Sequence, residues 1–408
     1  MLLLIALAVA FIYLALLYAA PGPDKSGAAA WSAPLQPKLL RNLVLSVVIF
    51  FFLDGVIFHT RLYQSLLEPK SNAGRVTALV RQEKQRSPTG GEEILMLGDS
   101  RMGIGFSEEV ANEIAAGRDV SFFNCSMPES VPRLWYYLLR EIDPSASRYQ
   151  AIVMPLKLDL DPSPLHTTLV HISQTAPLLR YTDAVAFAAS FDSWSDQSRA
   201  FVACLLRGSA FQADLLDFLE HPLQRISHLK QPRRDLPRHA FHKRADQDVV
   251  GIDYDPLTHE LKIPERLSKR QRNSIQNSIQ NTEELARSAN CSSNCYDWTK
   301  RILQRYDSSV TSVVLVHLPK GPLAAKLENR GAAQNNATEA LRGHKVIVFD
   351  PAQFAFLEQP AYYMDGSHLN GKGQEQFTRR LTEDLLAQFD SRNAAQAQAA
   401  GGPPLRER

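Results

Sequence analysis

The sequence predicts an α/β protein in which helices cover both faces of a parallel sheet. Short apolar runs rich in β-branched residues alternate with segments that carry a helical apolar period. These runs contain few charges, which is typical of strands that are buried on both faces. Polar motifs follow the first and the last of them, at the sheet edge where ligands bind in such folds.

Individual elements can be assigned along the chain. The first strand is expected at Ile94–Leu97 and leads directly into Gly98-Asp99-Ser100. A helix is expected over Ser107–Ala116, with Ser107 as its N-cap, because acidic residues occupy the turn that follows. The remaining strands are expected at Val120–Phe123, Ala151–Pro155, Ser312–Leu318 and Lys345–Phe349, and the remaining core helices at Val131–Ile142 and Gln374–Phe389.

Residues 161–304 predict a mainly helical insertion, because they show no clear strand pattern. The core on either side of it is expected to comprise residues 92–160 and 305–390. Within the insertion, Asn273–Asn281 is a polar repeat in which Ile275 and Ile279 lie one helical turn apart. This spacing indicates a helix with one narrow apolar edge.

Two apolar runs predict a transmembrane hairpin over residues 1–60. The first, at 2–20, carries no charge, and the second, at 43–59, is broken by Asp54. Basic residues between the runs favour a cytoplasmic loop, so the large domain of this multi-pass membrane protein is expected outside the cytoplasm, in the periplasm. Asp54 is expected to face the other span, a partner membrane protein or the interface.

Two further segments are expected to lie outside the core. Residues 61–91 are polar and end in a Pro/Gly-rich turn, which predicts a stalk or linker. Residues 391–408 are rich in Ala, Gln, Gly and Pro, which predicts a disordered tail.

The basic stretch Arg225–Arg244 is expected either to contact anionic lipid or an acidic polymer, or to form a solvated helical face.

Composition excludes several classes of function. The net charge of +2 gives no global attraction for nucleic acid, and no recognition motif accompanies the basic stretch, so no nucleic-acid partner is expected. The sequence contains neither a glycine-rich phosphate loop nor a His-Glu-x-x-His motif, so no cofactor and no metal are expected. Cys291 and Cys295 either close a small disulfide outside the cytoplasm or remain thiols.

Ser100, Asp365 and His368 together predict nucleophilic acyl transfer. A serine hydroxyl needs a base within hydrogen-bond reach and donors for the oxyanion that forms. Ser100 follows the first strand, and Asp365-Gly-Ser-His368 lies between the last strand and the last helix, so both motifs reach one sheet edge. His368 would take the hydroxyl proton, and Asp365 would orient the imidazole. The backbone N–H of Ser100 would be one oxyanion donor.

Three other polar residues lie near this edge. Arg101 is expected to pair with Asp99, or alternatively to steady an anionic substrate. His317 is expected to be a satisfied histidine at the sheet rim, and Asp350 a helix cap or loop anchor.

Gly98-Asp99-Ser100 and Asp365-Gly-Ser-His368 resemble the nucleophile and Asp-x-x-His blocks of the SGNH/GDSL hydrolase superfamily. The resemblance covers roughly 91–160 and 305–390 and implies a flavodoxin-like three-layer α/β/α core, with Ser100 as nucleophile, His368 as base and Asp365 as its partner. The family's middle blocks supply oxyanion donors from a glycine and an asparagine. This chain has Asn124-Cys-Ser126 and Pro155-Leu-Lys157 there, so Ser126, Asn124 and Lys157 are the candidate replacements.

The membrane helices and the Gly-Asp-Ser-Arg start look more like the membrane-anchored branch of that superfamily, whose members work on envelope polymers beside membrane-bound O-acyltransferases. This resemblance implies a serine esterase or O-acyltransferase that acts on an acylated carbohydrate or a similar O-acyl ester, with a membrane-bound O-acyltransferase as a possible partner. Two alternatives stay open. One is an inactive scaffold that binds polymer or an acyltransferase, and the other is a lipid-ester hydrolase.

Overall fold

The chain forms two compact units in a computed structural model that describes residues 37–156, 165–230, 248–255, 257–258, 260–287, 296–324, 341 and 346–399. The first unit combines Met1–Arg81 with Asp161–Leu236, and the second combines Gln82–Leu160 with Pro237–Arg408. The first expected transmembrane run, Lys157, Cys291, Cys295 and most of the basic stretch lie outside the described residues.

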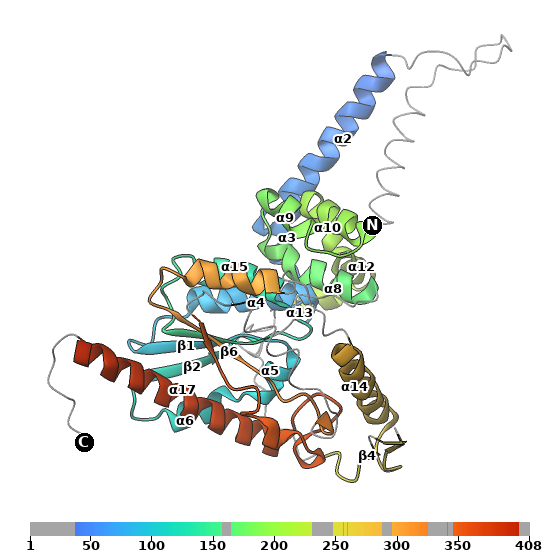
Figure 1. The fold of residues 1–408 in the computed structure, drawn as a ribbon. Helices are drawn as coiled ribbons and strands as arrows, with labels where there is room; N and C mark the ends of the chain where they lie inside the picture. Colours follow the sequence, from blue (N-terminus) through green and yellow to red (C-terminus); the bar gives the residue numbers. More distant parts are fainter. Residues whose placement is uncertain are drawn as a thin grey trace. The chain divides into compact units, whose positions relative to one another are not determined.

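A five-stranded parallel sheet forms the centre of the second unit (Figure 1). Its strands are β1 (Glu92–Met96), β2 (Val120–Asn124), β3 (Ala151–Pro155), β6 (Ser312–Val316) and β7 (Val346–Val348), in the order β2-β1-β3-β6-β7. The order reverses beside β1, because the chain passes from β1 to β2 on one side and returns to β3 on the other. Such a switch point is where parallel sheets open a crevice at the carboxyl ends of their strands. All five strands fall where the apolar runs predict them.

Helices cover both faces of this sheet. Figure 1 shows α5 (Ser100–Gly105), α6 (Glu108–Ile114) and α17 (Gly371–Ala399) on one side and α15 (Asp297–Tyr306) on the other. The helix α7 (Pro132–Ile142) packs against α15. The ring of Trp298 in α15 contacts Tyr136 and Tyr137 of α7, each at a centroid distance of 5.4 Å. The N-cap expected at Ser107 is confirmed, since its side chain accepts a hydrogen bond from the N–H of Val110.

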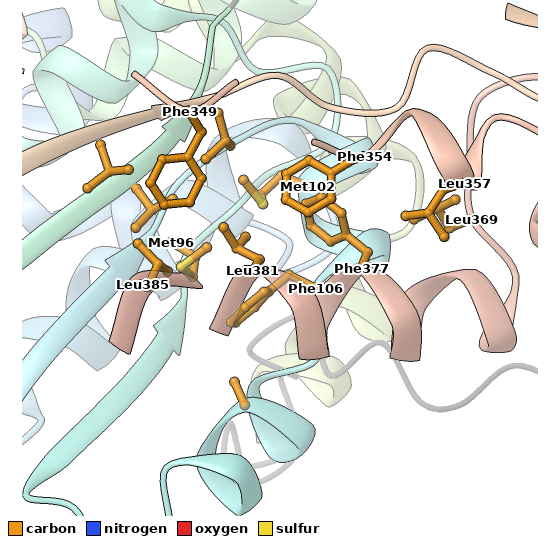
Figure 2. Close-up of a cluster of buried hydrophobic side chains, with 14 of the residues drawn as sticks. Met96, Met102, Phe106, Phe349, Phe354, Leu357, Leu369, Phe377, Leu381 and Leu385 are labelled. Carbon is orange, nitrogen blue, oxygen red and sulfur yellow. The ribbon is translucent and has the colours of Figure 1, made fainter. Parts of the chain in front are cut away.

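The main core lies between the sheet and α17. Phe377, Leu381 and Leu385 of α17 point toward Met96 of β1 and Met102 of α5 (Figure 2). All five side chains are fully buried. Burial of a side chain of this size contributes roughly 1.5–3 kcal/mol, so α17 is held firmly against the strand that leads to Ser100.

Two regions of the second unit differ from the expected organisation. The boundary between the units divides the expected insertion, 161–304, and its later part belongs with the sheet. That part contains a short antiparallel pair, β4 (Asp253–Asp255) with β5 (Glu260–Lys262), and the helix α14 (Lys269–Arg287). Strands this short carry too few residues to show a period of two, which is why the sequence pattern misses them.

The expected tail is helical at its start, since α17 continues to Ala399. Residues 391–399 are rich in Ala and Gln, which are good helix formers, so a helix that is already anchored by packing extends through them at little cost. Where disorder is expected from residue 391 onward, the structure has a helix as far as Ala399.

The first unit is helical in its described part. It contains α2 (Pro37–Phe58), α3 (Arg61–Gln64), α8 (Leu165–Thr175), α9 (Ala184–Ala188), α10 (Trp194–Leu205), α11 (Arg207–Ala210), α12 (Gln212–Glu220) and α13 (Pro222–Lys230). Short 3-10 turns at Ala176–Leu178 and Tyr181–Asp183 join α8 to α9. The segment 61–91, expected to be a stalk or linker, instead holds α3 and α4 (Asn72–Gln85), with Tyr63, Leu67 and Val76 buried. The boundary between the two units falls within α4, after Arg81.

Within the described residues, α2 is the one helix long and apolar enough to cross a membrane, over Arg41–Phe58. Large apolar side chains on it, such as Val48, Phe52 and Leu53, are exposed. This is weak evidence for membrane association, because length and composition alone support it.

Asp54 binds the start of a helix from the same chain. Its two carboxylate oxygens accept hydrogen bonds from the backbone N–H groups of Arg207 and Gly208, each at 3.0 Å, at the beginning of α11. His59 Nε2 lies 3.4 Å from the same carboxylate. Asp54 is 4% exposed, so neither lipid nor a separate protein is needed to satisfy it.

Arg225, at the start of the basic stretch, is buried rather than solvated. Its guanidinium forms ion pairs with Asp214 at 2.9 Å, Asp217 at 2.5 Å and Glu68 at 3.4 Å. Asp214 also accepts a hydrogen bond from the hydroxyl of Tyr63. For Arg225 the expectation of a solvated or ligand-binding face is therefore wrong, because three carboxylates of its own unit surround it.

The contact between α2 and α11 predicts a stability effect. We expect Asp54→Ala to lower the free energy of unfolding of the full-length protein by roughly 2 kcal/mol or more, because two buried N–H groups lose their acceptor. Unfolding of the protein in detergent, followed by circular dichroism, measures this. Asp192→Ala, at an exposed position of the same unit, is the matched control. Equal effects of the two substitutions would contradict the assignment.

Candidate active site

Ser100 lies at the first residue of α5, directly after the turn that leaves β1. Gly98 makes this turn possible, because a Cβ at that position would come within 2.3 Å of the Cβ of Met102. The carbonyl of Gly98 accepts hydrogen bonds from the N–H of Met127 at 2.8 Å and the hydroxyl of Ser130 at 2.7 Å. The loop after β2 therefore holds the turn that presents Ser100.

The carboxyl end of α5 is held by side chains from β2 and α17. A helix of six residues leaves its last carbonyls without intrahelical partners. Here side chains from outside the helix donate to these carbonyls. Asn124 Nδ2 donates to the carbonyls of Gly103 at 3.3 Å and Phe106 at 2.9 Å. From α17, Gln374 Nε2 donates to the carbonyl of Ile104 at 2.6 Å, and Thr378 Oγ1 donates to that of Gly105 at 3.3 Å. These contacts make a helix that is too short to be stable alone into a fixed support for Ser100.

Asp365 and His368 lie in a closed turn that leads into α17. The N–H of Met364 donates to the carbonyl of His368 at 3.0 Å, and the N–H of Asn370 donates to the carbonyl of Tyr362 at 2.9 Å. Asn370 then accepts from the N–H of Gly373 at 2.9 Å, near the start of α17. The same helix therefore contacts α5 and continues from the turn that carries His368.

The three predicted side chains meet in one hydrogen-bonded row. His368 Nε2 is 2.9 Å from Ser100 Oγ, although 268 positions separate the two residues. His368 Nδ1 is 2.9 Å from Asp365 Oδ2 and 3.1 Å from Asp365 Oδ1. The side chains of His368 and Asp365 are 22% and 21% exposed, so solvent reaches the row from one side.

The environment of Asp365 favours its ionised form. Burial by itself raises the pKa of this carboxyl, but the hydrogen bond and the charge of His368, with the backbone N–H groups of Ser367 and His368, outweigh it and lower the pKa overall. Those N–H groups donate to Asp365 Oδ1 at 2.9 Å and 2.8 Å. An ionised carboxylate can only accept, so Nδ1 of His368 is the donor to Asp365, and in the neutral imidazole Nε2 then accepts from Ser100.

Two of the predicted oxyanion donors are already engaged. The amide nitrogen of Asn124 donates to the carbonyls of Gly103 and Phe106 at the end of α5. The N–H of Ser126 donates to Asn124 Oδ1 at 3.1 Å. In this arrangement both residues support the loops around Ser100, and Lys157 lies outside the described residues.

Arg101 and Asp350 make contacts within the fold near the same edge, and His317 follows β6. Arg101 pairs with Asp99 at 3.2 Å, and this carboxylate raises the pKa of the guanidinium. Burial, with Lys320 nearby, lowers the pKa of His317. Asp350 accepts a hydrogen bond from the N–H of Ala352 at 2.7 Å, as expected of a loop anchor.

The residues that contact the turn of Asp365 and His368 are not identifiable from the sequence alone. The hydroxyl of Ser367 lies 3.3 Å from His368 Nδ1. Gln271, Ser274 and Ser278 of α14 bind the backbone of the same turn. The signal was present in the polar repeat of α14, but nothing local says what that repeat contacts. Within the part of the chain that the structure describes, no group of three or more His, Cys, Asp or Glu side chains is arranged as a metal site.

The lowered pKa of Asp365 predicts how stability depends on pH. The unfolded carboxyl, with an ordinary pKa of 3.8, takes up its proton before the folded one as the pH falls. The contribution of Asp365 is therefore complete above that value and is lost as the pH falls through the lowered folded pKa. We expect the difference in unfolding free energy between the wild type and Asp365→Asn to shrink below about pH 4.

Denaturant unfolding of the full chain in detergent over a pH series measures this difference. Asp307→Asn, at an exposed position of the same unit, is the control. A difference that stays constant, or that grows as the pH falls, would show that Asp365 is not held in its ionised form.

Comparison with known proteins adds no assignment to this geometry. No protein-family model matches the chain, and no curated protein matches it either. The proposed roles of Ser100, Asp365 and His368 therefore rest on their positions and chemistry.

Proposed function

We propose that this protein is a membrane-anchored serine esterase or O-acyltransferase of the SGNH type that acts on O-acyl esters of an envelope polysaccharide. The observation that carries the proposal is the row Ser100–His368–Asp365, whose members lie within hydrogen-bond distance of each other at the carboxyl end of β1. A nucleophile, a base and an acid in this order form the constellation that activates a serine hydroxyl.

In the proposed reaction, Ser100 Oγ attacks the acyl carbonyl while its proton passes to His368 Nε2. The tetrahedral adduct collapses when His368 returns the proton to the leaving alcohol oxygen, and an acyl group remains on Ser100. Water or a sugar hydroxyl then attacks this ester, again with His368 as base, and frees the serine. Throughout, the ionised Asp365 stabilises the imidazolium.

The backbone N–H of Ser100 is the proposed oxyanion donor. It belongs to the first turn of α5, where the helix dipole favours negative charge. In that turn, the N–H of Arg101 donates to the side chain of Asp99 and the N–H of Gly103 to its carbonyl. The donor groups of Asn124 and Ser126 are engaged within the fold. A second oxyanion donor would therefore have to come from another residue, or the loop after β2 would have to shift.

Topology and composition support the rest of the proposal. The strand order β2-β1-β3-β6-β7 is the order 2-1-3-4-5 of a flavodoxin-like sheet, and helices on both of its faces are compatible with three layers. The exposed apolar surface of α2 supports a membrane anchor. We further propose that the chain crosses the membrane twice, with the sheet unit in the periplasm, and that a membrane-bound O-acyltransferase supplies or receives the acyl group.

One observation favours a second candidate, an inactive scaffold that binds polymer or an acyltransferase. The N–H of Ser126 and the amide of Asn124 are both engaged within the fold. A serine with one oxyanion donor would react slowly, because loss of a single donor costs about 10²–10³ in rate in known serine enzymes.

A fluorophosphonate probe separates the two candidates. We expect it to label the purified full-length protein at Ser100, because the hydroxyl oxygen attacks phosphorus and fluoride leaves. His368→Ala is expected to lower the labelling rate about a hundredfold or more, since the general base is lost. Labelling is followed by mass spectrometry of the intact protein.

Ser100→Ala should abolish labelling, whereas Ser145→Ala, at an exposed serine of the same unit, should leave it unchanged. A folded wild type that stays unlabelled would favour the scaffold. If the protein is labelled, release of acetate faster than long-chain acid from model esters supports the polysaccharide esterase, and the reverse supports a lipid-ester hydrolase.

A further inference from the structure

The helix α14 carries a polar repeat that the proposed chemistry does not use. Its sequence over Asn273–Asn281 repeats Ser-Ile-Gln-Asn, so a serine and an isoleucine each recur after four residues. This spacing places each pair on one side of the helix, one turn apart. Ile275 is buried in the core of the sheet unit, with Ile279 packed against it. The adjacent stripe of Ser274 and Ser278 therefore also faces the protein.

This serine stripe binds the turn that contains Asp365 and His368. The N–H of Gly366 donates to Ser274 Oγ at 3.2 Å, and Ser278 Oγ donates to the carbonyl of Gly366 at 2.6 Å. One turn earlier, Gln271 Nε2 donates to the carbonyl of Met364 at 3.1 Å. Gln271, Ser274 and Ser278 follow one another at intervals of three and four residues, so a single face of α14 makes all these contacts.

The two serines hold both peptide groups that flank Gly366. The N–H of Gly366 belongs to the peptide that joins it to Asp365, and its carbonyl belongs to the peptide that joins it to Ser367. Glycine has the greatest backbone freedom of any residue, and here it lies between the proposed acid and the proposed base. The two hydrogen bonds fix both peptide planes and so restrict backbone rotation at Gly366. Rotation there would change the distance between Asp365 and His368.

Close backbone packing makes Gly366 necessary at this position. A Cβ on Gly366 would lie 2.3 Å from the carbonyl oxygen of Ser274. Gly321, in the loop after β6, also packs here, since a Cβ on it would lie 2.9 Å from the carbonyl oxygen of Gly366 and 3.1 Å from Ser278 Oγ. The turn is thus enclosed between α14 and the loop after β6, with hydrogen bonds on the α14 side.

We propose that α14 is a positioning element for the acid–base pair, in which Ser274 and Ser278 orient the Asp365–His368 turn toward Ser100. This rests on the proposed serine chemistry, and it assigns to the polar repeat a role in the chemical step. Neither serine touches the reacting atoms; each acts through Gly366. Because displacement of a catalytic group by about 1 Å can cost a hundredfold in rate, loss of both hydrogen bonds should slow the attack by Ser100.

The test compares two double variants of the full-length protein in detergent. Ser274→Ala with Ser278→Ala removes the hydrogen bonds, and Asn273→Ala with Asn277→Ala alters two exposed positions of the same helix. The kinetics of fluorophosphonate labelling give the maximal labelling rate and the half-saturating probe concentration separately. We expect the serine variant to lose about tenfold to a hundredfold in maximal rate, with an unchanged half-saturating concentration and a melting temperature close to that of the asparagine variant.

Hydrogen–deuterium exchange of a peptide covering Tyr363–Asn370 is the second readout. The serine variant should exchange faster there, and the asparagine variant should match the wild type. A maximal labelling rate within about twofold of the wild type, or equal losses in both variants, would overturn the proposal. If the wild type itself is not labelled, the serine chemistry fails, and unchanged exchange in the serine variant would then show separately that α14 does not hold the turn.

Discussion

The contacts of α17 with α5 are the constraint on which the candidate site depends. Gln374 and Thr378 of α17 bind carbonyls at the end of the six-residue helix that begins with Ser100. The same α17 begins directly after the turn that carries His368. The apolar side chains that anchor α17 on the sheet therefore also set the distance between the hydroxyl of Ser100 and the imidazole of His368, which are far apart in sequence.

Carboxylates that bind backbone N–H groups recur throughout the structure. Asp54 accepts from an N–H at the start of α11, and Asp99 accepts from an N–H in the first turn of α5. Asp365 accepts from the backbone N–H of His368 within its own turn. Each N–H group would otherwise lack a partner at a helix start or a tight turn. At Asp365 these bonds have a second effect, because they lower the pKa and keep the carboxylate available to orient the imidazole.

Much of the sheet unit could be predicted from sequence, because its strands are buried on both faces and leave a strong local pattern. The strand Ala151–Pro155 was predicted with the bounds that the structure has, and Ser107 was identified as an N-cap from its neighbours. The helices of the segment 61–91 are not evident from the sequence because α3 and α4 are mostly polar, and only tertiary packing buries residues such as Tyr63. The pair β4–β5 is too short to leave any pattern.

The sequence by itself determined which side chains could take part in the proposed acyl transfer, because a strand before Ser100 and a helix after His368 direct both to one sheet edge. Only the tertiary structure decided how the surrounding polar groups are used. Asn124 and Ser126 support α5 and its loop, Asp54 binds α11, and the polar repeat of α14 contacts Gly366. The reason is physical: a hydrogen bond depends on a partner within about 3 Å, and for most of these groups that partner lies far away in the sequence.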